Sequence, residues 1–239
     1  MKIRTMYLGL FMLIFLPMSA IYGQAYQYPI LPGTEKWSTL DNHQAMVDAC
    51  QIPIDILQKM TTKDLVETCV NYPLKTDLYS YSTIKEGIEK VASKFNGFKD
   101  LFKREDNYTY LFDFLGKSRT TIVKEIDSEM GNIEKGEIIY NISLVETLLS
   151  FDDILQHSNG KQKNALIELS RELLDFKMNS NGKFSNYSIT SSALLLGIAL
   201  QKVSPNTSIS RNMEKFLAGK MMLDETILQE MNQMYKNSK

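Results

Sequence analysis

The two cysteines of this chain lie at the ends of one short stretch, CQIPIDILQKMTTKDLVETC, which runs from Cys50 to Cys69. Thiols of this kind can act as nucleophiles, bind zinc, form a disulfide or fill a core. A nucleophile needs a base, and His43 precedes Cys50 by seven residues. On one helix that spacing separates the two side chains by about 10.5 Å along the axis, which is too far for a hydrogen bond. The spacing therefore argues against a Cys–His pair.

A zinc site would have to combine His43, Cys50, Cys69 and a carboxylate such as Asp64. The residue types suit zinc, but their spacing matches no tight C-x₂-C or H-x₃-H pattern. Histidine is the commonest general base, and the only other histidine is His157. The sequence also contains no GxGxxG, GxxxxGK[ST], HExxH or GxSxG motif. We therefore predict no catalytic residue, no metal site and no cofactor.

Two loops and one carboxylate pair have weaker similarities to functional sites. The loop that begins at Asp127 has Ile138 where an EF-hand needs glutamate, and a second loop begins at Lys177 instead of a carboxylate. Asp152 and Asp153 are adjacent, so on a helix their side chains diverge by about 100°. Glycoside hydrolysis needs two carboxylates that face each other across a cleft, which this pair does not supply.

The first residues predict the compartment of the protein. Two basic residues precede an apolar run, YLGLFMLIFLPM, and small residues follow in SAIYGQ. This three-part pattern is typical of a secretory signal peptide, and the run is shorter than the ~20 residues that span a bilayer. We expect residues 1–23 to be cleaved off after Gly23, or alternatively after Ala20. An uncleaved N-terminal anchor is the other reading of the same pattern. The sequence thus predicts export to the periplasm, the cell surface or the medium.

The remaining chain is long enough for one large domain, since 239 − 23 leaves about 216 residues. The predicted signal peptide contains two of the 27 Lys and Arg residues and none of the 28 Asp and Glu residues, so the net charge becomes 25 − 28 = −3. Nucleic acids and anionic membrane surfaces favour basic patches. We therefore expect neither nucleic-acid binding nor stable membrane insertion after cleavage.

Residues 24–37, QAYQYPILPGTEKW, differ in composition from the rest of the chain. They contain two prolines, a glycine and three aromatic residues, and each proline favours extended backbone in the residue before it. We predict an extended arm with Tyr28, Ile30 and Trp37 as its docking groups. The arm either packs on its own domain or offers a strand to a partner protein.

Helical patterns recur through residues 38–239, which we predict to form a single domain. Ser38 with Asp41, and Thr61 with Asp64, have the spacing of capping boxes. The clearest amphipathic stripe comprises Leu166, Leu169, Leu173 and Phe176. Strand alternation is nearly absent, so the predicted class is all-α, with eight to ten short antiparallel helices stacked in layers.

Gly116 is predicted to end a series of short helical segments, and residues 117–135 have no clear pattern. The segment TSSALLLGIALQKV, by contrast, is apolar nearly all round, which predicts a central buried helix.

Three segments resemble motifs of a family of exported, uncharacterised proteins from Bacteroidetes. They are YPILPGTEKW, ACQIPIDILQKMTTKDLVETCVNYPL and GFKDLF. The likeness is clearest over residues 28–105 and vaguer over 191–201. It implies export past the inner membrane and a helical body, and it brings no catalytic residues to this chain.

These observations favour an exported binding or scaffold protein of the cell envelope, which interacts with another exported or envelope protein. Stacked helix pairs offer surfaces for such partners. The alternative is an enzyme that acts on envelope material or polysaccharide through scattered Asp, Glu and Tyr residues, and a small-ligand carrier is a third possibility. An enzyme should have a deep pocket with convergent ionisable groups, whereas a binding module should have a shallow apolar groove or patch.

The predicted compartment also bears on Cys50 and Cys69. Export would place both thiols in an oxidising environment. We predict a disulfide between them, which would close a loop of about 20 residues and stabilise the fold by roughly 3 kcal/mol. Two buried free thiols are the alternative.

Overall fold

The computed structural model describes residues 24–238, so the predicted signal peptide lies outside the described residues. Within them the chain forms thirteen α-helices and one 3-10 helix, with no strand. This confirms the predicted all-α class. The thirteen α-helices exceed the predicted eight to ten, and three of them have only four residues.

The helices follow one another closely along the chain. The first seven elements are α1 (Glu35–Ser38), α2 (His43–Ala49), α3 (Ile54–Leu57), α4 (Thr62–Val70), the 3-10 helix η1 (Lys75–Tyr79), α5 (Ile84–Ala92) and α6 (Asn96–Leu101). The last seven are α7 (Asn107–Glu125), α8 (Asn132–Leu149), α9 (Asp152–Leu155), α10 (Gly160–Met178), α11 (Asn186–Val203), α12 (Arg211–Leu217) and α13 (Glu225–Asn237).

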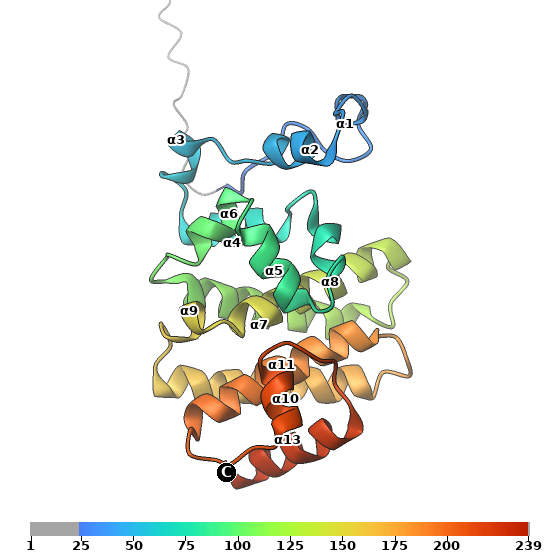
Figure 1. Ribbon diagram of the computed structural model, residues 1–239. Helices are drawn as coiled ribbons and strands as arrows, with labels where there is room; N and C mark the ends of the chain where they lie inside the picture. Colours follow the sequence, from blue (N-terminus) through green and yellow to red (C-terminus); the bar gives the residue numbers. More distant parts are fainter. Residues whose placement is uncertain (1–23, 239) are drawn as a thin grey trace, which may run out of the picture.

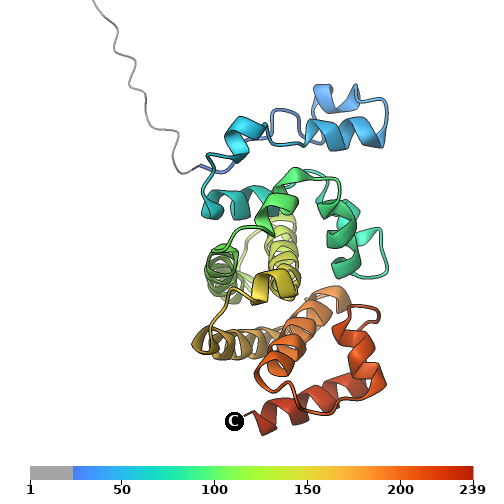
Figure 2. The same ribbon diagram turned by 60° about the vertical axis from the view of Figure 1, so that its left-hand side comes forward.

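The helices are stacked in layers that follow the order of the sequence (Figures 1 and 2). α1 to α3 lie at one end of the stack, and α13 lies at the other (Figure 1). The two central layers are the pairs α7 with α8 and α10 with α11, and α8 packs against α11 to join them. η1 packs against α5, on the N-terminal side of these pairs.

The arm docks on its own domain through two tyrosines. The Tyr26 backbone N–H donates to Thr68 Oγ1 at 2.9 Å, and the Tyr28 hydroxyl donates to the Thr68 carbonyl oxygen at 3.1 Å. Tyr28 is buried and Trp37 is half-buried against the core, while Ile30 is half-buried. Thr68 belongs to α4, so the arm lies on that helix.

The predicted arm, residues 24–37, is extended over only part of its length. Its last residues form α1, which begins at Glu35 and is capped by the Thr34 side chain. The predicted capping box at Ser38 is also wrong. α2 is capped by Asn42, whose side chain accepts from the Ala45 N–H, because the turn between the two helices ends only there.

The predicted helix start at Thr61 is confirmed. Thr61 caps α4 by accepting from the Asp64 N–H, and its hydroxyl donates to the Asp64 carboxylate at 2.5 Å. Pro53 immediately precedes α3, where its missing N–H costs no helical hydrogen bond.

α7 differs most from the prediction, because it continues through Gly116 instead of ending there. Its buried residues include Leu115 and Ile122, which are seven residues apart on one face. Arg119 lies between them and reaches across to Glu172 of α10, with 2.8 Å between the two charged groups. This polar residue interrupts the apolar pattern without interrupting the helix.

α11 is the central helix that the apolar segment predicts. Eleven of its residues are buried, from Ser188 to Leu200. It packs against α8 and α10, and both α12 and α13 cover it from the C-terminal side. Within residues 24–238, neither this helix nor any other combines the length and the apolar character that a membrane span requires.

Candidate functional site

A charged pair lies in the core between α8, α10 and α11. The Lys177 ammonium group is 2.7 Å from Glu146 Oε2, and both side chains are fully buried. Ser191 also donates to Glu146 Oε2, at 2.6 Å, and Ser192 donates to Glu146 Oε1. Lys177 donates a second hydrogen bond to the Ser188 carbonyl oxygen at 2.8 Å. We call these five residues the buried ion-pair cluster.

The cluster is placed by the same helical faces that build the core. Lys177 follows Leu173 by four residues, so it occupies the next position on the apolar face of α10. Glu146 lies between Val145 and Thr147 in a stretch of α8 that is buried on all sides. A charge buried at such a position must be paired and hydrogen-bonded. Burial lowers the pKa of the Lys177 ammonium, and the Glu146 carboxylate opposes that effect.

An open hollow of about 400 Å³ lies directly beside this cluster. Its walls come from η1, from α8 and from the start of α11. The lining residues are Thr76, Tyr79, Gly136, Ile139, Tyr140, Ser143, Ser185 and Ser188. We call it the tyrosine hollow. Its volume is within the range of ligand pockets, about 300–1,000 Å³.

The hollow and the cluster share an element of structure. Ser143 donates to the Ser188 hydroxyl at 3.0 Å, and the Ser188 carbonyl oxygen receives the hydrogen bond from Lys177. The wall of the hollow is therefore anchored to the ion pair. The field of Glu146 reaches this wall, because burial and then the Glu146 charge raise the pKa of the Tyr79 hydroxyl.

The two tyrosines of the hollow are held in place by their neighbours. The ring centroids of Tyr79 and Tyr140 lie 4.8 Å apart. The Tyr187 ring packs edge-on against Tyr79, with 5.9 Å between the ring centroids. The Tyr140 hydroxyl donates to the Lys75 carbonyl oxygen, and the Lys75 ammonium lies 5.4 Å from the Tyr140 ring. Rings held in this way offer a rigid contact surface that loses little entropy when a ligand binds.

The hollow has the chemistry of a binding surface. Its lining provides tyrosine rings, hydroxyl groups and one isoleucine, and none of its eight residues is a carboxylate, lysine, histidine or cysteine. Among the neighbouring charged groups, Glu146 and Lys177 have no exposed side-chain surface and bind each other, and the Lys75 ammonium pairs with Glu137. The arrangement can hold an aromatic or apolar group and hydrogen-bond to its polar neighbours.

The predicted disulfide between Cys50 and Cys69 is wrong. Both cysteines are buried free thiols, and they do not lie close together. Cys50 caps the end of α2, whereas Cys69 lies within α4. The Tyr28 side chain of the arm lies near both, since after burial the charges of Cys69 and Cys50 raise the pKa of its hydroxyl. The arm thus contacts the region that a disulfide would have to bridge.

The other residues considered for catalysis or metal binding lie apart from one another. His43 bonds to Asp77, Asp64 bonds to Thr61, and Asp127 pairs with Lys183. Asp152 pairs with Lys202 at 2.8 Å. In the part of the chain that the structure describes, no three His, Cys, Asp or Glu side chains are grouped to hold a metal ion.

The sequence contains a signal for the buried ion-pair cluster. Glu146 and Lys177 are charged residues at positions where the helical pattern requires apolar ones. Two such exceptions in one domain indicate a pair, because an unpaired buried charge is too costly. The tyrosine hollow has no comparable signal, since η1, α8 and α11 come together only in the folded chain.

Comparisons with known proteins add no relative to this picture. The chain matches no protein-family model, no curated protein and no solved structure. The resemblance to exported Bacteroidetes proteins therefore stays a prediction from the motifs.

Proposed function

We propose that this chain is an exported helical binding module of the cell envelope, and that the tyrosine hollow holds a segment of another exported or envelope protein. The observation that carries the proposal is the composition of the hollow. Tyrosine, serine and glycine, which make up six of its eight lining residues, are among the residue types enriched in antibody paratopes. Tyrosine is also among the residues that contribute most binding energy in protein interfaces.

The geometry of the neighbouring charges supports binding over catalysis. A catalytic acid or base must reach the bound substrate. Glu146 and Lys177 instead have their side chains turned to each other and to serines in the core. The open shape and neutral lining of the hollow match the shallow surface expected of a binding module, and a substrate cleft would need ionisable groups that face it.

Gly136 offers a direct test, because it lines the hollow and has open space above it. A Cβ at this position would meet no atom within 4 Å, so Gly136→Trp should fill the hollow without disturbing α8. Gly116 of α7 is the matched control, since a Cβ there also meets no atom within 4 Å and it does not line the hollow.

The measurement is affinity capture of proteins from the envelope of the cells that make this protein, quantified by mass spectrometry. We expect a partner that wild type and Gly116→Trp retain equally and that Gly136→Trp loses by about tenfold, which corresponds to 1.4 kcal/mol. Equal capture by all three proteins would refute binding at the hollow. Turnover of a glycan or peptide library by the purified protein, without any retained partner, would favour the enzyme alternative.

A further inference from the structure

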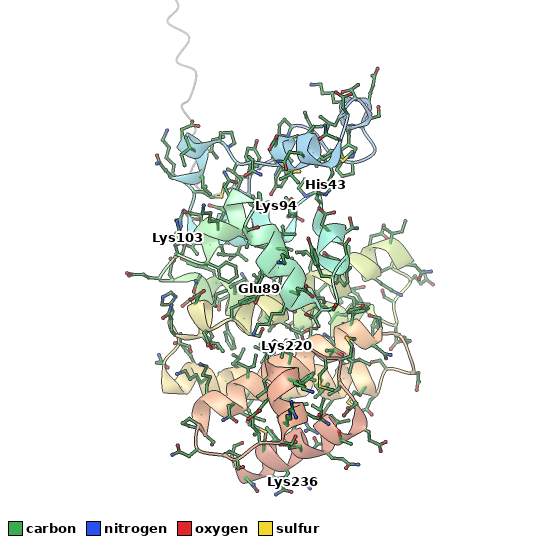
Figure 3. The ribbon with its side chains drawn as sticks, in the orientation of Figure 1. His43, Glu89, Lys94, Lys103, Lys220 and Lys236 are labelled. Carbon is green, nitrogen blue, oxygen red and sulfur yellow. The ribbon has the colours of Figure 1, made fainter. Side chains whose placement is uncertain are left out.

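A second hollow lies between α2 and α5, on the other side of η1. Its volume is about 300 Å³. α2 contributes His43, the segment after η1 contributes Ser80 and Tyr81, and α5 with the residues just after it contributes Lys90 and Lys94. We call it the lysine hollow. Figure 3 labels His43 and Lys94, which lie in neighbouring layers at the N-terminal end of the molecule.

The two lysines give this hollow its charge. They are four residues apart, so they project from the same face at the end of α5. Neither ammonium group forms an ion pair with any residue in the range 24–238, in contrast to Lys75, Lys183 and Lys202. Like charges at this spacing repel each other, and an anion between them would relieve that repulsion.

The only carboxylate of the lining is already occupied. The ring of His43 donates from Nε2 to Asp77 Oδ2 at 2.7 Å. This bond engages the carboxylate within the wall and holds the imidazole ring at the edge of the hollow. Asp77 is consequently not directed at Lys90 or Lys94, and the lining keeps a net positive charge.

Hydrogen bonds just outside the hollow join the segment after α2 to the segment after α5. Gln51 donates to the Lys94 carbonyl oxygen at 3.1 Å and accepts from the Asn96 N–H at 3.1 Å. Asn96 in turn accepts from the Ile52 N–H at 3.0 Å and donates to the Ile52 carbonyl oxygen at 2.7 Å. These four bonds tie the end of α2 to the end of α5, so the positions of both walls are set before any ligand arrives.

We propose that the lysine hollow binds a phosphate-type oxyanion between Lys90, Lys94 and the His43 side of the wall. Ammonium groups act as point charges toward phosphate, and donors on separate walls suit a tetrahedral anion. The Tyr81 hydroxyl has no partner among the described residues and can donate a further hydrogen bond. This site is distinct from the tyrosine hollow, so the inference goes beyond the proposed function.

The phosphate group could belong to a free phosphate ion or to the headgroup of an anionic lipid. The experiment distinguishes these two ligands. The purified protein is titrated with inorganic phosphate by calorimetry. In a second arm it is sedimented with vesicles of phosphatidylglycerol or, as a neutral reference, of phosphatidylcholine. The test variant is Lys90→Gln with Lys94→Gln, made together and singly.

The control variant is Lys99→Gln with Lys103→Gln, which removes the same charge at the same spacing. Both control lysines are exposed and lie outside the hollow, and Figure 3 shows Lys103 on the opposite side of the view from His43. Unfolding midpoints of all variants are compared to confirm that each is folded.

We expect the test variant to weaken binding by about tenfold or more and the control to leave it within about twofold, since hydrogen bonds from a charged donor are roughly twice as strong as neutral ones and only the test lysines line the hollow. If wild type binds phosphate and the test variant loses that binding, the ligand is a free anion. If the test variant loses binding only to phosphatidylglycerol vesicles, the ligand is a lipid headgroup. No binding in either arm, or equal effects of the test and control variants, would overturn the proposal.

Discussion

Glu146 accepts hydrogen bonds from three donors inside the core, and this saturation makes a buried charge tolerable. Lys177 and two serines surround its carboxylate, and the Lys177 ammonium has a second acceptor in the Ser188 carbonyl. Replacing one member of a buried pair leaves the other charge uncompensated, which costs far more than the pair itself contributes. The cluster therefore connects α8, α10 and α11 through hydrogen bonds between their side chains and backbone.

This arrangement predicts strong coupling between Glu146 and Lys177. We expect Lys177→Met to destabilise the fold by about 3–5 kcal/mol, because it leaves the carboxylate buried and unpaired. The double variant Glu146→Gln with Lys177→Met should be more stable than the sum of the single effects indicates. Urea unfolding of the four proteins measures the coupling, and a loss below about 1 kcal/mol for Lys177→Met would contradict the assignment.

Cys50 and Cys69 should be unreactive in the folded protein. Burial, with a smaller contribution from Asp77, raises the pKa of the Cys50 thiol to about 12, and burial raises the pKa of Cys69 well above its usual value. Thiol reagents at pH 8 should therefore modify two cysteines only after denaturation. If the reagent modified neither cysteine in the denatured, unreduced protein, a disulfide between them would be indicated.

The same shift has a consequence for stability at alkaline pH. The thiol stays protonated in the folded chain, whereas in the unfolded chain it ionises near pH 8.5. The contribution of the Cys50 thiol to the stability of the fold is therefore fully present below about pH 8.5, and it is lost as the pH rises toward 12. Cys50→Ala should lose stability less steeply than wild type between pH 8 and pH 11, as measured by urea midpoints across that range.

At the scale of the elements, η1 is the segment on which both hollows depend. It contributes Tyr79 to the tyrosine hollow and Asp77 to the lysine hollow. η1 reaches this position because α5 has a glycine at the contact. A Cβ at Gly87 would overlap the Leu78 carbonyl oxygen, so only glycine allows the two backbones to approach this closely.

Two glycine substitutions that should change the free energy of unfolding in opposite directions test this contact. We expect Gly87→Ala to destabilise the fold by about 1–3 kcal/mol, because backbone must move to admit the methyl group. Gly116→Ala in α7 should instead stabilise it by about 0.5–1 kcal/mol, since the added Cβ meets no atom within 4 Å. Thermal unfolding of both variants gives the two signs, and a neutral Gly87→Ala would contradict the close packing of η1 on α5.

Local signals predicted the helices well where the residues act within one turn. Thr61 marks a real helix start. In the predicted stripe of α10, Leu166 and Leu173 are buried, whereas Leu169 and Phe176 are half-buried. The prediction failed in α7, where Arg119 reaches another helix. A side chain whose partner is distant in sequence looks like a break in the pattern when only its neighbours are considered.

At the scale of the whole molecule, the layered order of the helices was predictable and the two hollows were not. Short connections and a near absence of strand patterns suffice to indicate stacked helices. Each hollow, however, combines residues that are far apart in the sequence, such as Tyr79 with Ser188 or His43 with Lys94. Their juxtaposition depends on how the layers pack, which the periodicity of a single helix does not encode.

The layered order also explains why hollows form beside η1. The long pairs α7 with α8 and α10 with α11 bury their faces against each other, whereas η1 is short and has α5 on one side and the start of α8 near the other. A short element between larger ones leaves hollows on both sides. The arm closes the same end of the molecule by its contact with α4.

The central claim is that the tyrosine hollow holds a protein segment, and site-specific photo-crosslinking tests it most directly. Thr76 is exposed and lines the hollow, so p-benzoylphenylalanine at this position places the reactive group at the contact. Lys236, exposed on α13 at the far end of the stack, is the control position (Figure 3). Illumination in the cells that make the protein should yield a covalent adduct with one protein from position 76 and none from position 236. The same adducts from both positions, or none from position 76, would contradict the claim.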